Sequence, residues 1–271
     1  MAVELYNRNG HFCVLFTDLV GAESDALQAN QCLIVDDKCG MLLDPGGQMT
    51  YNELYVTMVR YMPPKSLQYV FASHADPDVI ASLQRWLNGS DIKLLISRIW
   101  ARFVPHFCAG GSLGGRLVEI PDRGGRVRLG RNDLWILPAH FLHSEGNFQI
   151  YDPVSRILFS GDLGASLLPP HRASRPIMNF DAHMPSMLAF HRRYMVSRKA
   201  CSLWAKMAAG LDIEMIVPQH GAPIRGKAAV GDFIDWIAKL ECGIDLMNQD
   251  DYRVPQAEWR LDAEGATKVT A

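Results

Sequence analysis

The segment Ser73-His-Ala-Asp-Pro-Asp78 constrains the fold of this chain most, because it concentrates an imidazole and two carboxylates in one turn. Residues 66–72 before it are apolar and aromatic, which predicts a buried strand. Residues 79–87 after it have the apolar spacing of a helix. Alternate residues in a turn from strand to helix can converge on one metal ion. Taken alone, the segment is equally compatible with either aspartate capping the helix.

Three further segments place a polar side chain beside a predicted strand. His143 stands between two predicted strands, Asp162 follows one, and His220 follows another. Each of these alone is more typical of a turn residue. Together with the first segment they form a set of six residues: His74, Asp76, Asp78, His143, Asp162 and His220. Three imidazoles and three carboxylates suit two metal ions, and the share of carboxylates favours iron or manganese over zinc.

The order of the predicted elements indicates two sheets with helices outside them. We expect strands at residues 11–17, 30–36, 38–44, 66–72, 92–97, 117–120, 125–129, 133–138, 147–151, 155–160 and 212–218, and helices at 50–61, 79–87, 98–107, 184–210 and 226–240. Two sheets packed face to face between outer helices would use this order fully, which predicts an α+β fold. We expect a single domain over residues 1–249 and a loosely attached tail at 250–271.

Other features of the sequence argue against several functions. Residues 110–115 are rich in glycine, but they lack the dinucleotide-binding spacing and precede a strand, so we expect a flexible loop. The net charge of −2 gives no reason to expect binding to nucleic acid or to a membrane surface. The first residues lack the charged leader and apolar core of a signal peptide, and the six cysteines include no Cys-x-x-Cys pair. We therefore predict a cytoplasmic protein with buried thiols.

The four ligand segments resemble the metal motifs of the metallo-β-lactamase superfamily. Ser73–Asp78 is similar to the first motif, His143–Asn147 to the second, Ser160–Asp162 to the third and Pro218–Gly221 to the last. The predicted hairpin at 30–47, with its Asp-Pro-Gly turn, is similar to the opening of the family. The resemblance implies a four-layer αββα metallo-β-lactamase sandwich.

Within the superfamily, the chain most resembles the flavodiiron branch, and there its oxygen-binding di-iron proteins. Three strings carry this resemblance: His143-Ser-Glu-Gly-Asn-Phe148, Leu158-Phe-Ser-Gly-Asp162 and Phe190-His-Arg-Arg-Tyr-Met195. The resemblance implies two iron ions joined by an oxo, hydroxo or peroxo bridge. The implied ligands are His74, Asp76 and His143 for one iron, Asp78 and His220 for the other, and Asp162 between them.

Two positions depart from the patterns of the wider superfamily. The hydrolases typically have histidines where Asp76 and Val79 stand, and the flavodiiron reductases usually have a glutamate where Asp76 stands. Valine cannot bind a metal, so we expect Val79 to leave a coordination position for water or oxygen. Aspartate is shorter than glutamate by one carbon–carbon bond, about 1.5 Å, so the metal at Asp76 must lie closer to its loop.

Other histidines near these motifs have weaker assignments. His140 either orients a ligand histidine or serves only its loop. His171 and His183 fall in an irregular segment that would cover the site in this fold, so we treat them as pocket candidates. We assign His191 and Tyr194 to helix packing and polar anchoring.

The resemblance implies a non-haem di-iron protein that binds dioxygen as a peroxo adduct and serves as an oxygen sensor or carrier. The flavodiiron reductases have a flavin domain after the metal domain, and only about thirty residues follow the last predicted helix, so we expect no flavin. The implied partners are a chemotaxis histidine kinase and a second copy of the chain in a homodimer. Two alternatives remain open. One is an oxygen, peroxide or nitric oxide reductase supplied by a separate electron-transfer protein, and the other is a hydrolase with two Zn²⁺ ions; Mn²⁺ is a further candidate metal.

Overall fold

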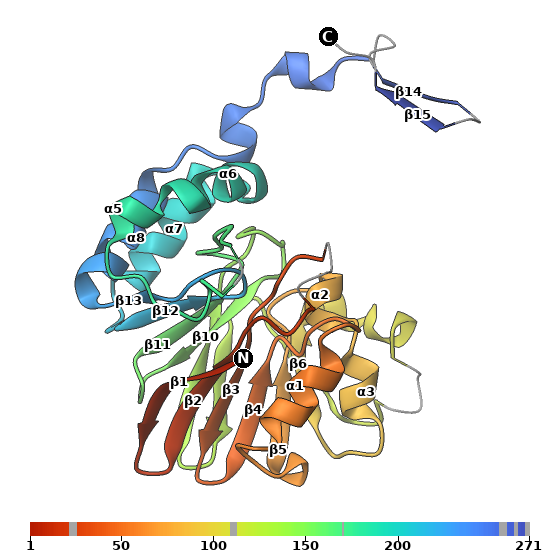
Figure 1. Cartoon of the computed structure of the whole chain (residues 1–271), viewed down its shortest axis with the longest axis vertical. Helices are drawn as coiled ribbons and strands as arrows, with labels where there is room; N and C mark the ends of the chain where they lie inside the picture. Colours follow the sequence, from red (N-terminus) through yellow and green to blue (C-terminus); the bar gives the residue numbers. More distant parts are fainter. Residues whose placement is uncertain (22–25, 109–112, 170, 255–258, 263–264, 269–271) are drawn as a thin grey trace.

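The computed structural model of the chain describes residues 1–21, 26–108, 113–169, 171–254, 259–262 and 265–268. Two large sheets pack face to face, and helices lie on the outer side of each sheet (Figure 1). This arrangement confirms the predicted α+β sandwich. The first sheet comes from the N-terminal half of the chain and the second from the C-terminal half, so we call them the N-terminal and C-terminal sheets.

The N-terminal sheet has seven strands whose order in space follows their order in the sequence. They are β1 (Ala2–Arg8), β2 (His11–Phe16), β3 (Gln31–Asp36), β4 (Cys39–Leu43), β5 (Leu67–Phe71), β6 (Lys93–Ser97) and β7 (Leu117–Ile120). Strands β1 to β4 pair antiparallel, whereas β4 to β7 pair parallel. The sequence pattern did not predict β1, because most of its side chains are only partly buried.

The C-terminal sheet has six strands in the order β13-β12-β11-β10-β9-β8. They are β8 (Gly125–Leu129), β9 (Asn132–Pro138), β10 (Phe148–Asp152), β11 (Ile157–Gly161), β12 (Met215–Pro218) and β13 (Ile224–Arg225). Strands β11 and β12 are parallel, and the other neighbours are antiparallel. Both β11 and β12 therefore end at the same edge of the sandwich, which matters for the site.

Helices cover both outer faces (Figure 1). Beside the N-terminal sheet lie α1 (Tyr51–Met58), α2 (Pro77–Ile80), α3 (Leu83–Leu87) and α4 (Arg98–Ala101), and beside the C-terminal sheet lie α5 (Phe180–His183), α6 (Pro185–Tyr194), α7 (Arg198–Ala208) and α8 (Lys227–Lys239). The prediction of one long helix at 184–210 is wrong. Met195 is extended and ends α6, and the Ser197 side chain caps α7 by accepting a hydrogen bond from the Ala200 amide.

The core consists of three apolar layers. Because side chains alternate along a strand, Leu15 of β2 points between the two sheets, whereas Val14 and Phe16 point toward the helices of the N-terminal sheet. A third cluster, which includes Trp204 and Phe233, fills the space between the C-terminal sheet and its helices. Burial on both faces explains why the strands read as nearly continuous apolar runs.

The last part of the chain lies apart from the two large sheets. After a 3₁₀ turn at Gln249–Tyr252, strands β14 (Trp259–Asp262) and β15 (Gly265–Lys268) pair with each other (Figure 1). Part of the predicted tail at 250–271 and half of the predicted loop at 110–115 fall outside the described residues. Among the described helices, none has the length and apolar character needed to cross a membrane.

Candidate metal centre

The six predicted ligands gather at one edge of the sandwich, on loops that leave the strands. Strand β5 leads to His74, Asp76 and Asp78, strand β11 to Asp162 and strand β12 to His220, whereas His143 precedes the antiparallel strand β10. The Phe148 amide donates to the Ser73 carbonyl at 2.9 Å, which joins the two sheets at this edge. The parallel register of β11 and β12 thus brings residues distant in sequence to one place.

Four of the side chains form a first group. His143 Nε2 lies 2.7 Å from Asp162 Oδ2 and 3.4 Å from Asp76 Oδ2. His74 Nε2 lies 3.6 Å from Asp76 Oδ2 and 3.9 Å from Asp162 Oδ2. The potential ligand atoms of His74, Asp76 and His143 all lie within 4.8 Å of one another, a spacing that one metal ion could bridge.

A second group shares Asp162 with the first. His220 Nε2 lies 3.3 Å from Asp78 Oδ2 and 3.6 Å from Asp162 Oδ1. The two oxygens of the Asp162 carboxylate therefore face different groups, Oδ2 the first and Oδ1 the second. Asp162 Oδ1 is buried and has no hydrogen-bond partner among the described residues, so it is an acceptor that a cation would satisfy.

Hydrogen bonds orient several of these side chains. His74 Nδ1 shares a hydrogen bond with Ser73 Oγ at 2.9 Å, and His220 Nδ1 donates to the Gln28 carbonyl at 2.8 Å. Both contacts leave Nε2 directed at the centre, as a metal-binding histidine requires. The side-chain amide of Gln219 donates from Nε2 to Asp78 Oδ2 at 3.2 Å. Gln28 and Gln219 were not predicted as orienting residues. Gln219 lies within the last ligand motif and Gln28 lies two residues before the predicted hairpin, which is the only signal that the sequence carries.

The electrostatic environment of the centre favours positive charge. Burial alone would lower the pKa of His74, but the nearby carboxylates of Asp76 and Asp162 raise it to about 9. Burial alone would raise the pKa of Asp162, but the surrounding histidines lower it to about 2. Burial raises the pKa of Asp44, which accepts a hydrogen bond from the Ser73 amide, to about 6. The site holds carboxylates charged in a buried place, which is the electrostatic requirement of a cation site.

Helix α6 covers the first group. The Tyr194 ring centre lies 5.6 Å from that of His143 and 4.6 Å from that of Phe190, on which it stacks. His191 is fully buried, and burial lowers its pKa to about 4, so it is neutral. It donates from Nδ1 to the Met187 carbonyl and accepts at Nε2 from the Gly164 amide at 3.0 Å. His191 therefore packs as predicted and also ties α6 to the loop of Asp162, whereas Tyr194 lies closer to the centre than helix packing alone implies.

Four predicted residues remain: His140, Val79, His171 and His183. His140 directs Nε2 to the Asp122 carbonyl at 2.7 Å and packs against Phe148, which gives it a structural role in the loop. Val79 is fully buried in the core under the helices. The His171 side chain is 73% exposed beside Asp18.

His183 is buried at the end of α5, where Ser186 lies beside it. Within the described part of the chain, neither His171 nor His183 makes a hydrogen bond, ion pair or ring contact with the six ligands. The suggestion that either lines the site stays a prediction.

The residues fit a pair of metal ions. Each group supplies imidazole nitrogen and carboxylate oxygen, and one carboxylate faces both groups. Such a donor set suits iron or manganese in a two-metal arrangement. Asp76 and Asp78 have side chains that are 46% and 39% exposed, so a small molecule can approach the centre from solvent.

Comparison with known proteins agrees with this geometry. The family profile described as ODP family beta lactamase matches residues 27–221. The chain is similar to a structure described as the peroxy diiron species of chemotaxis sensor ODP, at 36% identity and a TM-score of 0.79, covering 90% of this chain and 97% of that one. It is equally similar to the apo state of chemotaxis sensor ODP from T. denticola, at 36% identity and a TM-score of 0.80, covering 91% and 97%.

Two more distant matches follow, one in structure and one in sequence. A mutant flavodiiron protein from Thermotoga maritima is 18% identical with a TM-score of 0.68, and the match covers 88% of this chain and 61% of that one. An uncharacterised protein from Methanocaldococcus jannaschii is 23% identical over 194 residues, which are 69% of this chain and 47% of the relative. The chain thus spans about half the length of the curated relative that it matches.

Proposed function

The chain belongs to the ODP family beta lactamases, and from this premise we propose that it binds dioxygen at a di-iron centre. The proposed ligands are His74, Asp76 and His143 for one iron, Asp78 and His220 for the other, and Asp162 as the bridge. We propose that oxygen binding serves sensing, with a signalling protein such as a chemotaxis histidine kinase as the partner. The description of the 36% identical neighbour as a chemotaxis sensor supports this role.

One observation carries the proposal: the Asp162 carboxylate faces two separate groups of ligands through its two oxygens. A single metal ion bound by the first group would leave the buried Asp162 Oδ1, which faces the second group, without a partner. A pair of metal ions would satisfy both oxygens at once. The similar structure of chemotaxis sensor ODP is a peroxy diiron species, which supports iron as that metal.

The residues of the chain have distinct tasks in this proposal. Two ferrous ions, when bound, supply the electrons that dioxygen accepts. Ser73 and the Gln28 carbonyl hold His74 and His220 with Nε2 toward the centre. Val79, buried in the core, would contribute no ligand to the second metal ion. The ring pair of Phe190 and Tyr194 shields His143 from water.

The test is anaerobic purification, metal analysis and absorption spectroscopy before and after the protein meets air. We expect about two iron ions per chain and a new visible absorption band upon exposure to oxygen. The Asp162→Asn variant should lose both. Asp152→Asn, at the C-terminal end of β10 where the carboxylate lies 2.8 Å from His11 Nε2, is the matched control and should keep both.

Three outcomes would contradict the proposal. An iron-loaded sample whose spectrum does not change in air would exclude oxygen binding at the centre. A zinc-loaded sample with esterase activity that a chelator removes would point to the hydrolase alternative. Sustained oxygen consumption with an added electron donor would instead assign the chain to the reductases.

A further inference from the structure

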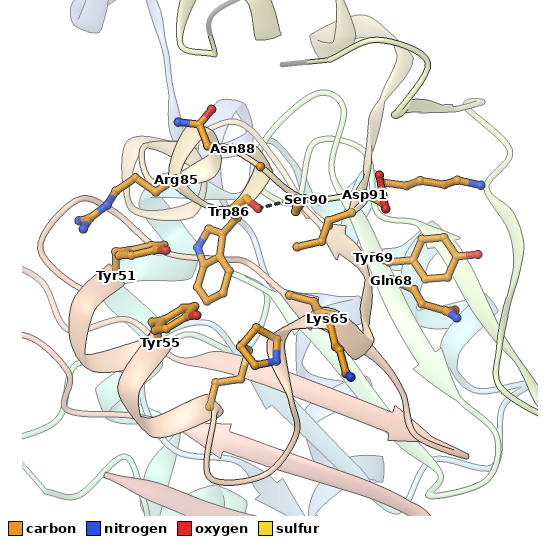
Figure 2. Close-up of a pocket in the computed structure, with 16 residues that line it drawn as sticks. Tyr51, Tyr55, Lys65, Gln68, Tyr69, Arg85, Trp86, Asn88, Ser90 and Asp91 are labelled. Carbon is orange, nitrogen blue, oxygen red and sulfur yellow. Dashed lines mark hydrogen bonds between the residues drawn. The ribbon is translucent and has the colours of Figure 1, made fainter. Parts of the chain in front are cut away.

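A pocket of about 680 Å³ lies between α1, α3 and the starts of β5 and β6. The metal loop follows the opposite, C-terminal end of β5. None of the six predicted ligands is among the described residues that line the pocket. Its volume is in the range of about 300–1,000 Å³ that small-molecule sites occupy. We call it the Trp86 pocket, after the indole in its lining (Figure 2).

Aromatic side chains form one wall of the Trp86 pocket. The Tyr51 ring meets the Trp86 ring edge to face, with 4.9 Å between the ring centres, and the Tyr55 ring lies 5.9 Å from Trp86. Tyr51 and Tyr55 stack on each other at 5.8 Å. Figure 2 shows both tyrosines on one side of the indole, with Lys65 and Tyr69 on the other side. Such a wall offers π faces to a flat ligand.

Cations outnumber carboxylates around the same pocket. Lys65, Arg85 and Lys93 line it, against Asp91 as the one lining carboxylate among the described residues. The chain as a whole has a net charge of −2, so this local excess runs against the average. In the described part of the chain, no carboxylate lies within 4.0 Å of these three cations. Their charge is therefore available to a ligand.

The Arg85 guanidinium is already positioned. It lies over the Tyr51 ring, 3.8 Å from the ring centre, and donates one hydrogen bond to Asn52 Oδ1 at 2.8 Å. A guanidinium has five N–H donors, so most of them remain free. A planar cation held over a tyrosine ring and by a hydrogen bond is prepared to receive an anion without a change of rotamer.

We propose that the Trp86 pocket binds an aromatic organic anion. The rings of the ligand would pack against Trp86 and the two tyrosines, and its carboxylate, sulfonate or phosphate would meet the cations at the rim. An aromatic wall without cations would fit a neutral ligand, and cations without the wall would fit any small anion. Their combination in one cavity selects a molecule that has both properties.

The Trp86 pocket is also connected to the metal loop. The Trp86 indole donates to the Pro45 carbonyl at 3.3 Å and to Ser82 Oγ at 3.2 Å, and Ser82 Oγ donates to the same carbonyl at 2.9 Å. The Gly46 amide donates to the Val79 carbonyl, and the Ser82 amide donates to the Gly46 carbonyl. Helices α2 and α3 and the turn after β4 thus form one hydrogen-bonded unit.

This unit begins at the proposed ligands. Asp76 and Asp78 lie at the start of α2, and Asp44, at the start of the turn, accepts from the Ser73 amide. Any shift of α2 on metal binding would therefore move the indole that forms the wall of the Trp86 pocket. We expect ligand binding in the pocket and iron binding to change each other's affinity, as linkage requires. This coupling, unlike the pocket itself, rests on the proposed function.

The test uses the full-length, metal-free protein and two fluorescent dyes with the same rings. 8-Anilinonaphthalene-1-sulfonate is an aromatic anion, and N-phenyl-1-naphthylamine is its neutral counterpart. We expect the anionic dye to bind with a dissociation constant on the order of 10–100 µM. The double variant Lys65→Gln/Lys93→Gln should weaken the anionic dye about tenfold and the neutral dye less than about twofold.

Two further variants complete the design. Tyr55→Ala, at a side chain that is 36% exposed, should weaken both dyes about fivefold without disturbing the core. Lys206→Gln, on the exposed face of α7, is the matched control for the loss of a lysine and should change neither dye. Anionic dye binding that none of the pocket variants alters would overturn the proposed site, as would no binding at all.

Coupling is tested by measuring the binding of the anionic dye to protein that has been loaded anaerobically with ferrous iron. Equilibrium dialysis gives the dissociation constant of the dye. We expect the dissociation constant to change at least about threefold, and the change to shrink in Ser82→Ala. Equal affinity with and without bound iron would overturn the coupling while leaving the pocket. A protein that takes up no iron but binds the dye as predicted would instead contradict the proposed function, so the two failures can be told apart.

Discussion

The two ends of the sandwich each hold a cluster of histidine and aspartate, and only one of them is built for a cation. At the end opposite the metal loops, His11 at the start of β2 lies between Asp36 at the end of β3 and Asp152 at the end of β10. Its Nδ1 is 3.2 Å from Asp36 and its Nε2 is 2.8 Å from Asp152. We call these three residues the His11 cluster. By distance alone, His11, Cys13 and Asp152 could hold a metal as well as His74, Asp76 and His143.

The difference lies in the donors around the carboxylates. Asp36 Oδ2 accepts hydrogen bonds from the amides of Arg131 and Asn132. Asp152 accepts from the Val154 amide and from the Ser155 amide and hydroxyl. Every oxygen of the His11 cluster has a donor, and both nitrogens of His11 are engaged. The cluster therefore joins the two sheets as a buried ion pair and has no acceptor left for a cation.

Cys13 strengthens this conclusion. Its thiol points at Asp152 Oδ2 at 3.5 Å, and burial raises its pKa well above the ordinary value. A metal would need the thiolate. At the other end, Asp162 Oδ1 has no donor among the described residues, and Asp76 and Asp78 reach solvent. The same residue types thus become an ion pair or a metal site according to whether backbone amides satisfy their oxygens.

The largest effect is expected when the shared carboxylate of the metal centre is removed. Asp162→Asn replaces one of two equivalent oxygens with an amide nitrogen, which cannot bind a metal facing it. We expect affinity for iron to fall at least about a thousandfold, or about 4 kcal/mol. Iron analysis after anaerobic dialysis measures the loss. A variant that retains its full iron content would show that the carboxylate does not bridge.

The reciprocal change at the other end should affect stability and not iron. Asp152→Asn removes one charge from the His11 cluster and leaves a buried imidazolium with Asp36 alone. Breaking a buried pair in this way costs about 3 kcal/mol in the free energy of unfolding. Urea denaturation of the metal-free protein measures it. Loss of iron per folded molecule, with unchanged stability, would mean that the His11 cluster is the metal site after all.

A matched pair of serine substitutions sharpens the contrast. Ser73→Ala removes the hydroxyl that holds His74, and we expect iron affinity to fall about ten- to a hundredfold, or about 2 kcal/mol. Ser155→Ala removes a hydroxyl that donates to Asp152, and we expect a loss of about 1.5 kcal/mol in stability with iron affinity unchanged. Dialysis and urea denaturation of both variants give the four values. If each variant lowered both iron affinity and stability by similar amounts, the two ends would not be independent.

The sequence permitted the metal end to be predicted better than the His11 cluster. Each ligand segment places histidine or aspartate directly beside an apolar run that predicts a strand. Four such segments predict a shared metal site even when no structure is known. His11, Asp36 and Asp152 are separated by 25 and 116 positions, and each looks like the ordinary polar boundary of a strand. Only the pairing of β2 with β3, and the packing of one sheet on the other, bring them together.

The success of the strand and helix predictions also depended on burial and on tertiary contacts. Most strands buried on both faces were predicted to within a residue or two, because their apolar runs are continuous; β10, predicted at 147–151, is Phe148–Asp152. The exception is β12, which was predicted at 212–218 and begins only at Met215. β1 has only partly buried side chains and escaped the pattern. The break between α6 and α7 depends on the Val196 amide, which donates to the Phe141 carbonyl of a distant loop. A sequence pattern does not contain such a tertiary contact.

The smallest predicted effect is a pH dependence that belongs to the His11 cluster alone. Burial alone would lower the pKa of His11, but Asp152 and Asp36 raise it above its ordinary 6.5. Burial alone would raise the pKa of Asp152, but the hydrogen bond with His11 lowers it below its ordinary 3.8. The contribution of His11 to stability is therefore complete below pH 6.5 and is lost as the pH rises through its raised pKa. That of Asp152 is present above pH 3.8 and is lost in more acidic solution.

The pair should accordingly stabilise the fold most between about pH 4 and pH 6.5. We expect the difference in unfolding free energy between wild type and His11→Gln to shrink from pH 6 to pH 8. Urea denaturation of both metal-free proteins at each pH measures it. The histidines of the metal centre titrate in both proteins, so they cancel in the difference as long as the two ends do not interact. A difference that grows toward pH 8 would mean that His11 is buried in its neutral form. The His11 cluster would then not be an ion pair.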